Sequence, residues 1–203
     1  GVGWSKIVRW AADKIIGLKV NIEGLENLPD EPCIVAAKHM SAWDTIVFVE
    51  AARMPAWVLK IELTKIPIYG QFLKSFGHIA VDRSQGASAL KNLLKGARRV
   101  LKIEKRDLVI FPEGTRSEPG AAPDYKPGVA GIYASLKDVK VVPVASNVGC
   151  FWGRKALLKK PGTATLKFLP PIEPGLDKVE FMKELETRIE TESNKLIKSV
   201  SEE

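Results

Sequence analysis

Cys33-Ile-Val-Ala-Ala-Lys-His-Met-Ser-Ala-Trp-Asp44 is the stretch from which the fold and the chemistry of this chain can be worked out. Residues 34–37 form a short apolar run that is partly β-branched, which predicts a buried strand. A helical pattern then runs from Ser41 to a stop at Pro55, with Ser41 as the expected N-cap. His39 therefore lies at the junction between a strand and a helix.

His39 and Asp44 lie on either side of this junction. On one continuous helix their side chains would point about 140° apart, but a turn can fold the imidazole onto the carboxylate. A carboxylate on one ring nitrogen fixes the tautomer and leaves the other nitrogen as a base. No obvious nucleophile accompanies the pair, so we expect the nucleophile to belong to the substrate. Alternatively, Asp44 only completes a capping box that begins at Ser41, and His39 is structural.

The composition is that of an ordinary globular protein. The 203 residues are 45% hydrophobic and 27% charged, so we expect residues 1–203 to form one domain. We expect neither a membrane-spanning helix nor a signal peptide. The net charge of +7 suits a nucleic acid, an anionic membrane or a phosphorylated substrate equally well. The 2 cysteines and 2 histidines form no metal-binding or redox motif, so we expect no metal and no cofactor.

Apolar β-branched runs alternate with helical patterns almost throughout the chain. This order predicts an α/β fold, in which a largely parallel or mixed central sheet is flanked by helices. In such sheets ligands bind beyond the carboxyl ends of the strands. Charged residues follow four of the expected strands directly, and these residues are His39, Lys60, Arg83 and the pair Glu113 and Arg116. We therefore expect them to face one cleft.

Phe111-Pro-Glu-Gly-Thr-Arg-Ser117 opens a long polar loop over residues 112–127, and loops of this length are usually functional. Gly114 permits an unusual backbone angle or the close approach of a ligand. The guanidinium of Arg116 and the neighbouring hydroxyl groups suit a phosphate. Alternatively, Glu113 and Arg116 form an ordinary surface ion pair. The residues that we predict to bind a substrate phosphate are Lys60, Arg83, Glu113, Gly114, Thr115, Arg116 and Ser117.

Two segments could face a membrane. Residues 4–18 have the pattern of an amphipathic helix with a tryptophan near its start. Residues 151–160 combine aromatic and leucine side chains with basic residues and no acidic residue, which suits an anionic bilayer. Alternatively, the helix packs on its own domain, and the second segment is a solvated hairpin or binds nucleic acid. The candidate membrane-facing residues are Trp4, Phe151, Trp152, Lys155, Lys159 and Lys160.

Four motifs occur in the order found in the glycerophospholipid acyltransferases, specifically the bacterial 1-acylglycerol-3-phosphate acyltransferases. His39-Met-Ser-Ala-Trp-Asp44 resembles the H-x4-D motif of the family, and Gly77-His-Ile-Ala-Val-Asp-Arg83 resembles G-x-I-x-x-x-R. The loop motif at residues 111–117 matches F-P-E-G-T-R-S, and Val142-Pro-Val144 resembles the short fourth block. The resemblance covers about residues 33–150. Lys38 departs from it, because many members have Asn before the histidine.

The resemblance implies a peripheral membrane enzyme at the cytoplasmic face of the inner membrane, without a cofactor. His39 would take the proton from the 2-hydroxyl of lysophosphatidic acid while Asp44 orients the imidazole. The freed oxygen would attack the thioester of acyl-CoA or acyl-carrier protein, giving phosphatidic acid. Arg116, with Arg83 and Lys60, would hold the acceptor phosphate, and an anionic membrane surface rather than a nucleic acid would be the partner.

Other functions stay open beside this one. An enzyme of the same family could use another acceptor, such as a lyso-aminolipid or glycerol 3-phosphate. A thioesterase could use His39 to activate water, and a non-catalytic protein could only bind lipid. Relatives often carry a longer N-terminal membrane-associated segment, of which residues 4–18 would be the remnant.

Overall fold

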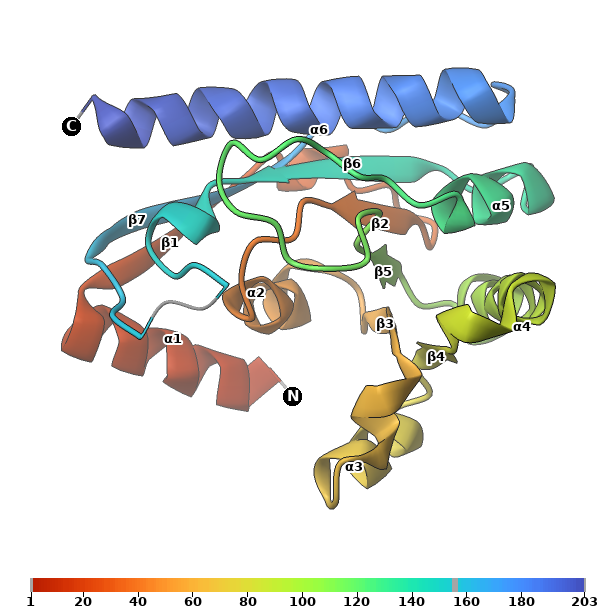
Figure 1. Cartoon of the computed structure of the whole chain (residues 1–203), viewed down its shortest axis with the longest axis horizontal. Helices are drawn as coiled ribbons and strands as arrows, with labels where there is room; N and C mark the ends of the chain where they lie inside the picture. The colour runs from red at the N-terminus through yellow and green to blue at the C-terminus, as the bar shows by residue number, and fades with distance from the viewer. Residues whose placement is uncertain (1, 155–156, 203) are drawn as a thin grey trace.

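A computed structural model describes residues 2–154 and 157–202 of the chain (Figure 1). Within these residues the strands are β1 (Leu18–Glu23), β2 (Ile34–Ala37), β3 (Ala56–Lys60), β4 (Ile79–Val81), β5 (Leu108–Ile110), β6 (Val141–Ser146) and β7 (Gly162–Phe168). The α-helices are α1 (Val2–Ile16), α2 (Trp43–Ala51), α3 (Tyr69–Ser75), α4 (Ala87–Arg98), α5 (Gly128–Ser135) and α6 (Lys178–Ser201).

The strands form one 7-stranded sheet with the order β1-β7-β6-β2-β5-β3-β4. β6, β2, β5, β3 and β4 run parallel to one another, and β1 runs parallel to β7. β7 runs antiparallel to β6, so the sheet is mixed and the predicted fold class is confirmed. Because β2, β3, β4 and β5 share one direction, their carboxyl ends meet at one edge of the sheet.

The two faces of the sheet carry separate hydrophobic cores. On one face α6 lies along β6, α5 packs against α6, and α4 packs against α5 (Figure 1). On the other face α1 and α2 cover the sheet. All of β2 is buried, and its residues alternate between the two cores: Ile34 and Ala36 face one, Val35 and Ala37 the other. A central parallel strand covered on both faces reads as a continuous apolar run, which is why residues 34–37 predicted it.

The helix after β2 begins one residue later than its sequence pattern predicted. α2 starts at Trp43 with Ala42 as its N-cap, and Ala42 provides no side-chain hydrogen bond. The prediction of Ser41 as the N-cap is therefore wrong by one residue. Ser41 still satisfies the first turn, because its Oγ accepts a hydrogen bond from the Trp43 N–H at 3.1 Å.

The segment around α3 differs more from the sequence prediction. The sequence of residues 66–76 predicts a helix with Pro67 in its first turn and Gly77 as its stop. In the structure Ile61–Lys65 forms a 3₁₀ turn and the helix begins only at Tyr69. Ile68, the residue before the helix, has a positive φ of 65°. Pro67 therefore lies in a tight connection between two short helical turns, where propensity alone does not set the boundary.

All the strands of the described chain belong to one sheet, and the formation of one domain by residues 1–203 stays a prediction. Among the described residues, no helix combines the length and the apolar character that crossing a bilayer requires.

Candidate active site

The turn after β2 brings His39 and Asp44 together, as the sequence predicted. His39 Nδ1 lies 2.9 Å from Asp44 Oδ2. The carboxylate of Asp44 is buried and an ionised carboxylate can only accept hydrogen bonds, so Nδ1–H donates to it. The lone pair of the imidazole is then on Nε2, which is free to act as a base.

Asp44 also holds the backbone of the turn. Its Oδ2 accepts hydrogen bonds from the N–H groups of Met40 and Ser41, each at 2.9 Å. The capping box that the sequence offered as an alternative does not form, because the N-cap is Ala42, which provides no side-chain hydrogen bond. One carboxylate oxygen still both contacts the histidine and holds the backbone of the turn. Asp44 Oδ1 is buried and has no hydrogen-bond partner among the described residues. The two backbone hydrogen bonds to Oδ2 fix the orientation of the carboxylate, and the contact of the same oxygen with Nδ1 fixes the orientation of the imidazole.

The imidazole of His39 is held on its face as well as on its edge. Its ring stacks on the ring of Phe111 with centroids 3.8 Å apart and an angle of 15° between the planes. Phe48 meets Phe111 edge-on, with centroids 6.2 Å apart. The side chain of His39 is 15% exposed, and it lines the large cavity of the protein.

This cavity lies at the carboxyl ends of the strands and has a volume of about 1830 Å³. Small-molecule sites commonly measure about 300–1,000 Å³, so this cavity has room for two substrates. Its polar end contains six residues that the sequence predicted to meet there, and they are His39, Lys60, Arg83, Gly114, Thr115 and Arg116. Its apolar walls come from α2, β3, α3, α4 and the start of α5, and include Ile46, Leu63, Phe72, Leu73, Leu90 and Leu93.

Arg83 is fixed against the loop that follows β5. Its Nη2 donates a hydrogen bond to the Gly114 carbonyl at 2.9 Å. Gly114 has a φ of 64°, and a Cβ at this position would lie 2.1 Å from Arg83 Nη2. Only glycine therefore permits both the backbone angle and the approach of the guanidinium. Asp82 accepts hydrogen bonds from Ser84, so Arg83 is held by the loop rather than by its acidic neighbour.

Glu113 and Ser117 are absent from the described lining of the cavity, so the structure does not bring them to the predicted phosphate site. Glu113 is 3% exposed, and its Oε1 accepts a hydrogen bond from Lys38 Nζ at 2.9 Å. Ser117 Oγ donates to Glu113 Oε2 at 3.1 Å, and its N–H donates to the His39 carbonyl at 2.8 Å. A buried carboxylate beside an ammonium is more stable than one facing a phosphate, which explains the inward orientation of Glu113.

Comparison with known proteins assigns this arrangement to a family. The sequence model of the family described as Acyltransferase matches residues 19–147, which is more than half of the chain. The chain belongs to the acyltransferase family. It is 32% identical over 187 residues to the 1-acyl-sn-glycerol-3-phosphate acyltransferase of Pseudomonas aeruginosa, and the match covers 92% of this chain and 72% of that protein.

Further similar proteins carry the same description. The protein of Helicobacter pylori is 31% identical over 177 residues, which cover 85% of this chain and 73% of that protein. The chain spans less of the plant relatives, for example 60% of the protein from Limnanthes douglasii. A solved structure supports the fold: the 1-acyl-sn-glycerophosphate (LPA) acyltransferase PlsC of Thermotoga maritima matches with a TM-score of 0.77 at 23% identity, over 96% of this chain and 79% of that one.

Three basic residues of the acyltransferase were not assigned to the site from its sequence. Arg154 and Lys126 line the cavity, and Arg154 Nη1 donates a hydrogen bond to the Arg116 carbonyl at 3.3 Å. Lys38 lies beneath the loop of Glu113 rather than in the cavity. Sequence carried no signal for Arg154, because its partner is 38 residues away in the chain.

Of the two aromatic residues predicted to face a membrane, Phe151 is buried and Trp152 is partly buried. Phe151 is 8% exposed, and its ring packs where a Cβ on Gly162 would lie, 2.3 Å from Phe151 Cε1. Trp152 stacks on the buried Trp43 with centroids 5.2 Å apart. The prediction of Phe151 as a membrane-facing residue is therefore wrong, because its ring belongs to the core beside α2. Trp152 is only partly buried against this core, so its role at a membrane stays a prediction.

The other membrane candidates have mixed outcomes. Trp4 is 60% exposed and lines the cavity. Lys159 Nζ lies 5.0 Å from the centroid of the Trp152 ring, and Lys160 is exposed. Lys155 lies outside the described residues.

His78 lines the cavity beside β3 as a neutral histidine. The Trp57 N–H lies 3.4 Å from His78 Nδ1 and donates a hydrogen bond to it. Burial, together with the positive charge of Arg106, lowers the pKa of His78 to about 4. Within the described residues, no group of three or more His, Cys, Asp or Glu side chains has an arrangement that could hold a metal ion.

Proposed function

We propose that this acyltransferase transfers an acyl group from an acyl thioester to the 2-hydroxyl of lysophosphatidic acid, which gives phosphatidic acid. The observation that carries the proposal is the 2.9 Å contact between His39 Nδ1 and Asp44 Oδ2 at the cationic end of a cavity. The relatives from Pseudomonas aeruginosa and Helicobacter pylori are named for this acceptor, which supports the proposal.

His39 is the general base of this reaction. Its Nε2 accepts the proton of the 2-hydroxyl while the oxygen attacks the thioester carbonyl, and Asp44 stabilises the imidazolium that forms. General-base catalysis of this kind contributes about 10²–10⁴-fold. The thiol of the donor has a pKa of about 8.5, so the thiolate leaves readily. The nucleophile is the acceptor itself, and no acyl-enzyme is needed.

The acceptor phosphate binds to the basic groups at the same end of the cavity. Arg83 is already oriented by the Gly114 carbonyl. The guanidinium of Arg116 and the ammonium of Lys60 have no recorded ion pair among the described residues, and both line the cavity. A guanidinium can hold two phosphate oxygens at once. Binding the phosphate there places the adjacent 2-hydroxyl near His39, and such positioning can supply several kcal/mol.

The apolar walls accommodate the acyl chains of donor and acceptor. Either acyl-CoA or acyl-carrier protein can present a thioester at this cavity, and the positive net charge of +7 attracts both of these anionic donors.

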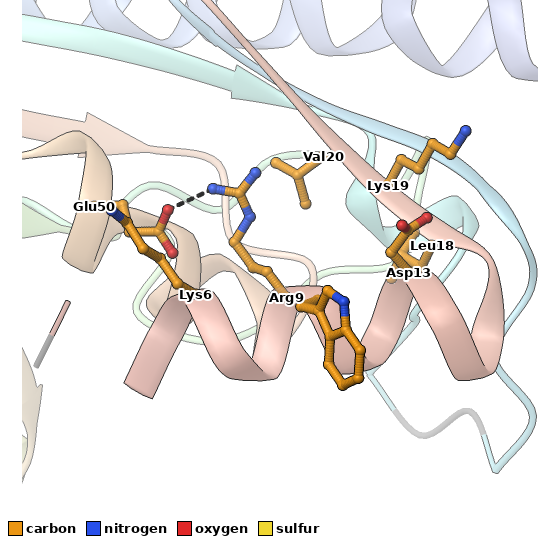
Figure 2. A pocket seen from close by; sticks show the side chains of 8 residues that line it. Lys6, Arg9, Asp13, Leu18, Lys19, Val20 and Glu50 are labelled. Carbon is orange, nitrogen blue, oxygen red and sulfur yellow. Dashed lines mark hydrogen bonds and ion pairs between the residues drawn. The ribbon is translucent and has the colours of Figure 1, made fainter. Parts of the chain in front are cut away.

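We further propose that the cavity opens towards an anionic bilayer between α1 and α3, with the enzyme peripheral at the cytoplasmic face of the membrane. α1 is fixed to the body by an ion pair of 2.6 Å between Arg9 Nη1 and Glu50 Oε2. Figure 2 shows Arg9 reaching from α1 towards Glu50 across a hollow that Lys6 and Lys19 also line. α1 turns a row of large apolar side chains outwards, and these are Trp4, Ile7, Trp10 and Ile15.

The α3 segment forms the other side of this opening. In Figure 1 it projects from the body on the side opposite α6. Its exposed apolar side chains are Ile66, Ile68, Tyr69, Phe72 and Phe76. Lys65 and Lys74 lie among them, so apolar groups can insert while ammonium groups meet anionic headgroups. Trp4 of α1 and Phe72 of α3 both line the cavity, which lets a lysolipid enter without leaving the bilayer surface.

The test is thiol release from palmitoyl-CoA, with and without lysophosphatidic acid, by the wild type and by His39→Ala. We expect release to need the lysolipid and to fall about 10²–10⁴-fold in the variant. Release without lysolipid would indicate a thioesterase instead. No release with palmitoyl-CoA or with palmitoyl-acyl-carrier protein would contradict the proposal, and lyso-aminolipid and glycerol 3-phosphate then serve as alternative acceptors.

A further inference from the structure

Lys38, which directly precedes the base His39 in the sequence, has a buried ammonium group. Lys38 is 2% exposed. Its Nζ lies 2.9 Å from Glu113 Oε1 and 2.9 Å from each carboxylate oxygen of Glu190. Lysine is almost never this buried unless it is paired. Replacing a buried ion pair by apolar residues is often neutral or stabilising, so stability alone does not account for this group.

The partners of Lys38 come from distant parts of the chain. Glu113 belongs to the loop after β5, and Glu190 lies in α6, 152 residues after Lys38. The backbone of Lys38 is itself fixed, because its N–H donates to the Val144 carbonyl of β6 at 2.9 Å. The ammonium therefore joins the end of β2, the loop and the last helix at one point.

A hydroxyl group orients each of the two carboxylates. Tyr125 Oη donates to Glu190 Oε1 at 2.9 Å, and Ser117 Oγ donates to Glu113 Oε2 at 3.1 Å. Burial and the negative charge of Glu190 raise the pKa of Tyr125, so its hydroxyl keeps the proton that it donates. Neither carboxylate can rotate without losing a hydrogen bond.

The loop after β5 is attached to the turn of His39 at two places, residues 113 and 117. At one end Glu113 pairs with Lys38, and at the other the Ser117 N–H donates to the His39 carbonyl at 2.8 Å. Arg116 lies between these two attachments and lines the cavity. The position of its guanidinium relative to His39 is thus set through the attachments at residues 38 and 39.

We propose that Lys38 is a positioning residue for acyl transfer: its ion pairs with Glu113 and Glu190 fix the spacing between the base His39 and the guanidinium of Arg116. The inference rests on the proposed function, since it concerns an acceptor held by its phosphate. In lysophosphatidic acid the phosphate and the 2-hydroxyl are carried by adjacent carbon atoms. A change in the spacing therefore moves the hydroxyl away from the base, and a misplacement of about 1 Å can cost about 10²-fold in rate.

If Lys38, Glu113 and Glu190 set this spacing, then the effects on activity of mutating this cluster and of mutating Arg116 should not be additive. Once Arg116 is removed, its distance from His39 no longer matters, so loss of the cluster should cost little further activity. A role in folding alone would lower activity by the same factor whether or not Arg116 is present. Residues that act through one another give such non-additive effects.

The experiment is a mutant cycle with kcat and KM for lysophosphatidic acid at saturating palmitoyl-CoA. The double variant Lys38→Met/Glu113→Gln removes the most deeply buried pair together, and Glu190, 15% exposed at its side chain, keeps its bond to Tyr125. Glu190→Gln is the milder variant, which keeps the shape of the side chain. Each is made with Arg116 and with Arg116→Ala. With Arg116 present we expect kcat to fall about 10- to 100-fold in the double variant and less in Glu190→Gln, with smaller changes in KM. In the Arg116→Ala background we expect losses below about threefold.

Glu192→Gln is the matched control. Glu192 also lies on α6 and pairs with Lys167 of β7 at 3.0 Å, away from residues 38 and 39. It should leave kcat and KM unchanged in both backgrounds. Equal losses in both backgrounds, or no loss when Arg116 is present, would overturn the inference, and Glu190→Gln decides the matter if the double variant does not fold. A wild type that does not acylate lysophosphatidic acid would instead contradict the proposed function.

Discussion

The two ends of the cavity are built in opposite ways. At the polar end Asp44 is buried, and its Oδ2 accepts hydrogen bonds from His39 Nδ1 and from two backbone amides, while Phe111 stacks on the imidazole. At the rim, large apolar side chains are open to solvent: Ile68 is 85% exposed and Trp4 is 60% exposed.

The difference follows from what each end has to recognise. Proton transfer needs a base within hydrogen-bonding distance of one hydroxyl, so its position must be fixed by several directional bonds. Contact with acyl chains needs only apolar area, because the hydrophobic effect is non-directional and proportional to the area that is buried. Hydrogen bonds are therefore concentrated around His39, and under the proposed membrane binding the rim is stabilised only when lipid covers it.

The largest effect on activity should come from a substitution of Asp44 at the polar end. In Asp44→Asn the side chain keeps its volume but loses the charge that stabilises the imidazolium. We expect kcat to fall about 10²–10⁴-fold, with little change in binding to vesicles. Thiol release in the presence of lysophosphatidic acid measures the first quantity, and vesicle co-sedimentation measures the second. Activity within tenfold of the wild type would show that the carboxylate serves only as a helix cap.

A smaller effect should come from placing a charge on the rim. Ile68→Asp removes an exposed apolar side chain, and aspartate tolerates the positive φ of this position better than isoleucine does. Inserting such a side chain into a bilayer is worth about 1.5–3 kcal/mol, so binding to vesicles that contain anionic lipid should weaken about 10- to 100-fold. The rate with detergent-dispersed substrates should change little.

Val179→Asp is the control for the rim. Val179 is 78% exposed, like Ile68, but it lies on α6 on the opposite side of the sheet (Figure 1). It should leave vesicle binding unchanged. If both variants bind as the wild type does, the membrane-facing surface lies elsewhere on the protein.

The smallest effect concerns stability and tests the environment of His78, which lines the cavity. The pKa of His78 is lowered from 6.5 to about 4, so the folded protein binds this proton less readily than the unfolded chain does. Its contribution to stability is complete above about pH 6.5 and is lost as the pH falls to about 4. Allowing for partial exposure, the free energy of unfolding should fall by on the order of 1–3 kcal/mol over this range. Urea denaturation at a series of pH values measures it, and a His78→Gln protein with the same slope would refute the assignment.

The sequence-based predictions were most accurate for features that depend on residues close together in the chain. The strand at residues 34–37 and the contact between His39 and Asp44 both depend on a few consecutive residues, and both are confirmed. Charged groups placed after parallel strands were also predicted well, because the common direction of the strands brings Lys60, Arg83 and Arg116 to one edge.

The predictions failed for side chains whose type is found both at binding surfaces and in the protein interior. Glu113 lies in a motif that suits a phosphate, yet it turns inward to Lys38. Phe151 suits a bilayer by composition, yet its ring is buried in the core beside α2. Composition does not distinguish a surface aromatic from a buried one, because burial depends on whether a space such as that over Gly162 is available.

By itself, the sequence determined the order of strands and helices, the histidine and its carboxylate, and the polar edge at which they would meet. These follow from periodicity and from spacing over a few residues. Only the tertiary structure decided that Glu190 would reach Lys38 across 152 residues, and that Arg154 would reach the carbonyl of Arg116. Such contacts depend on how α6 and the loop after β5 pack on the sheet, and no local pattern records that packing.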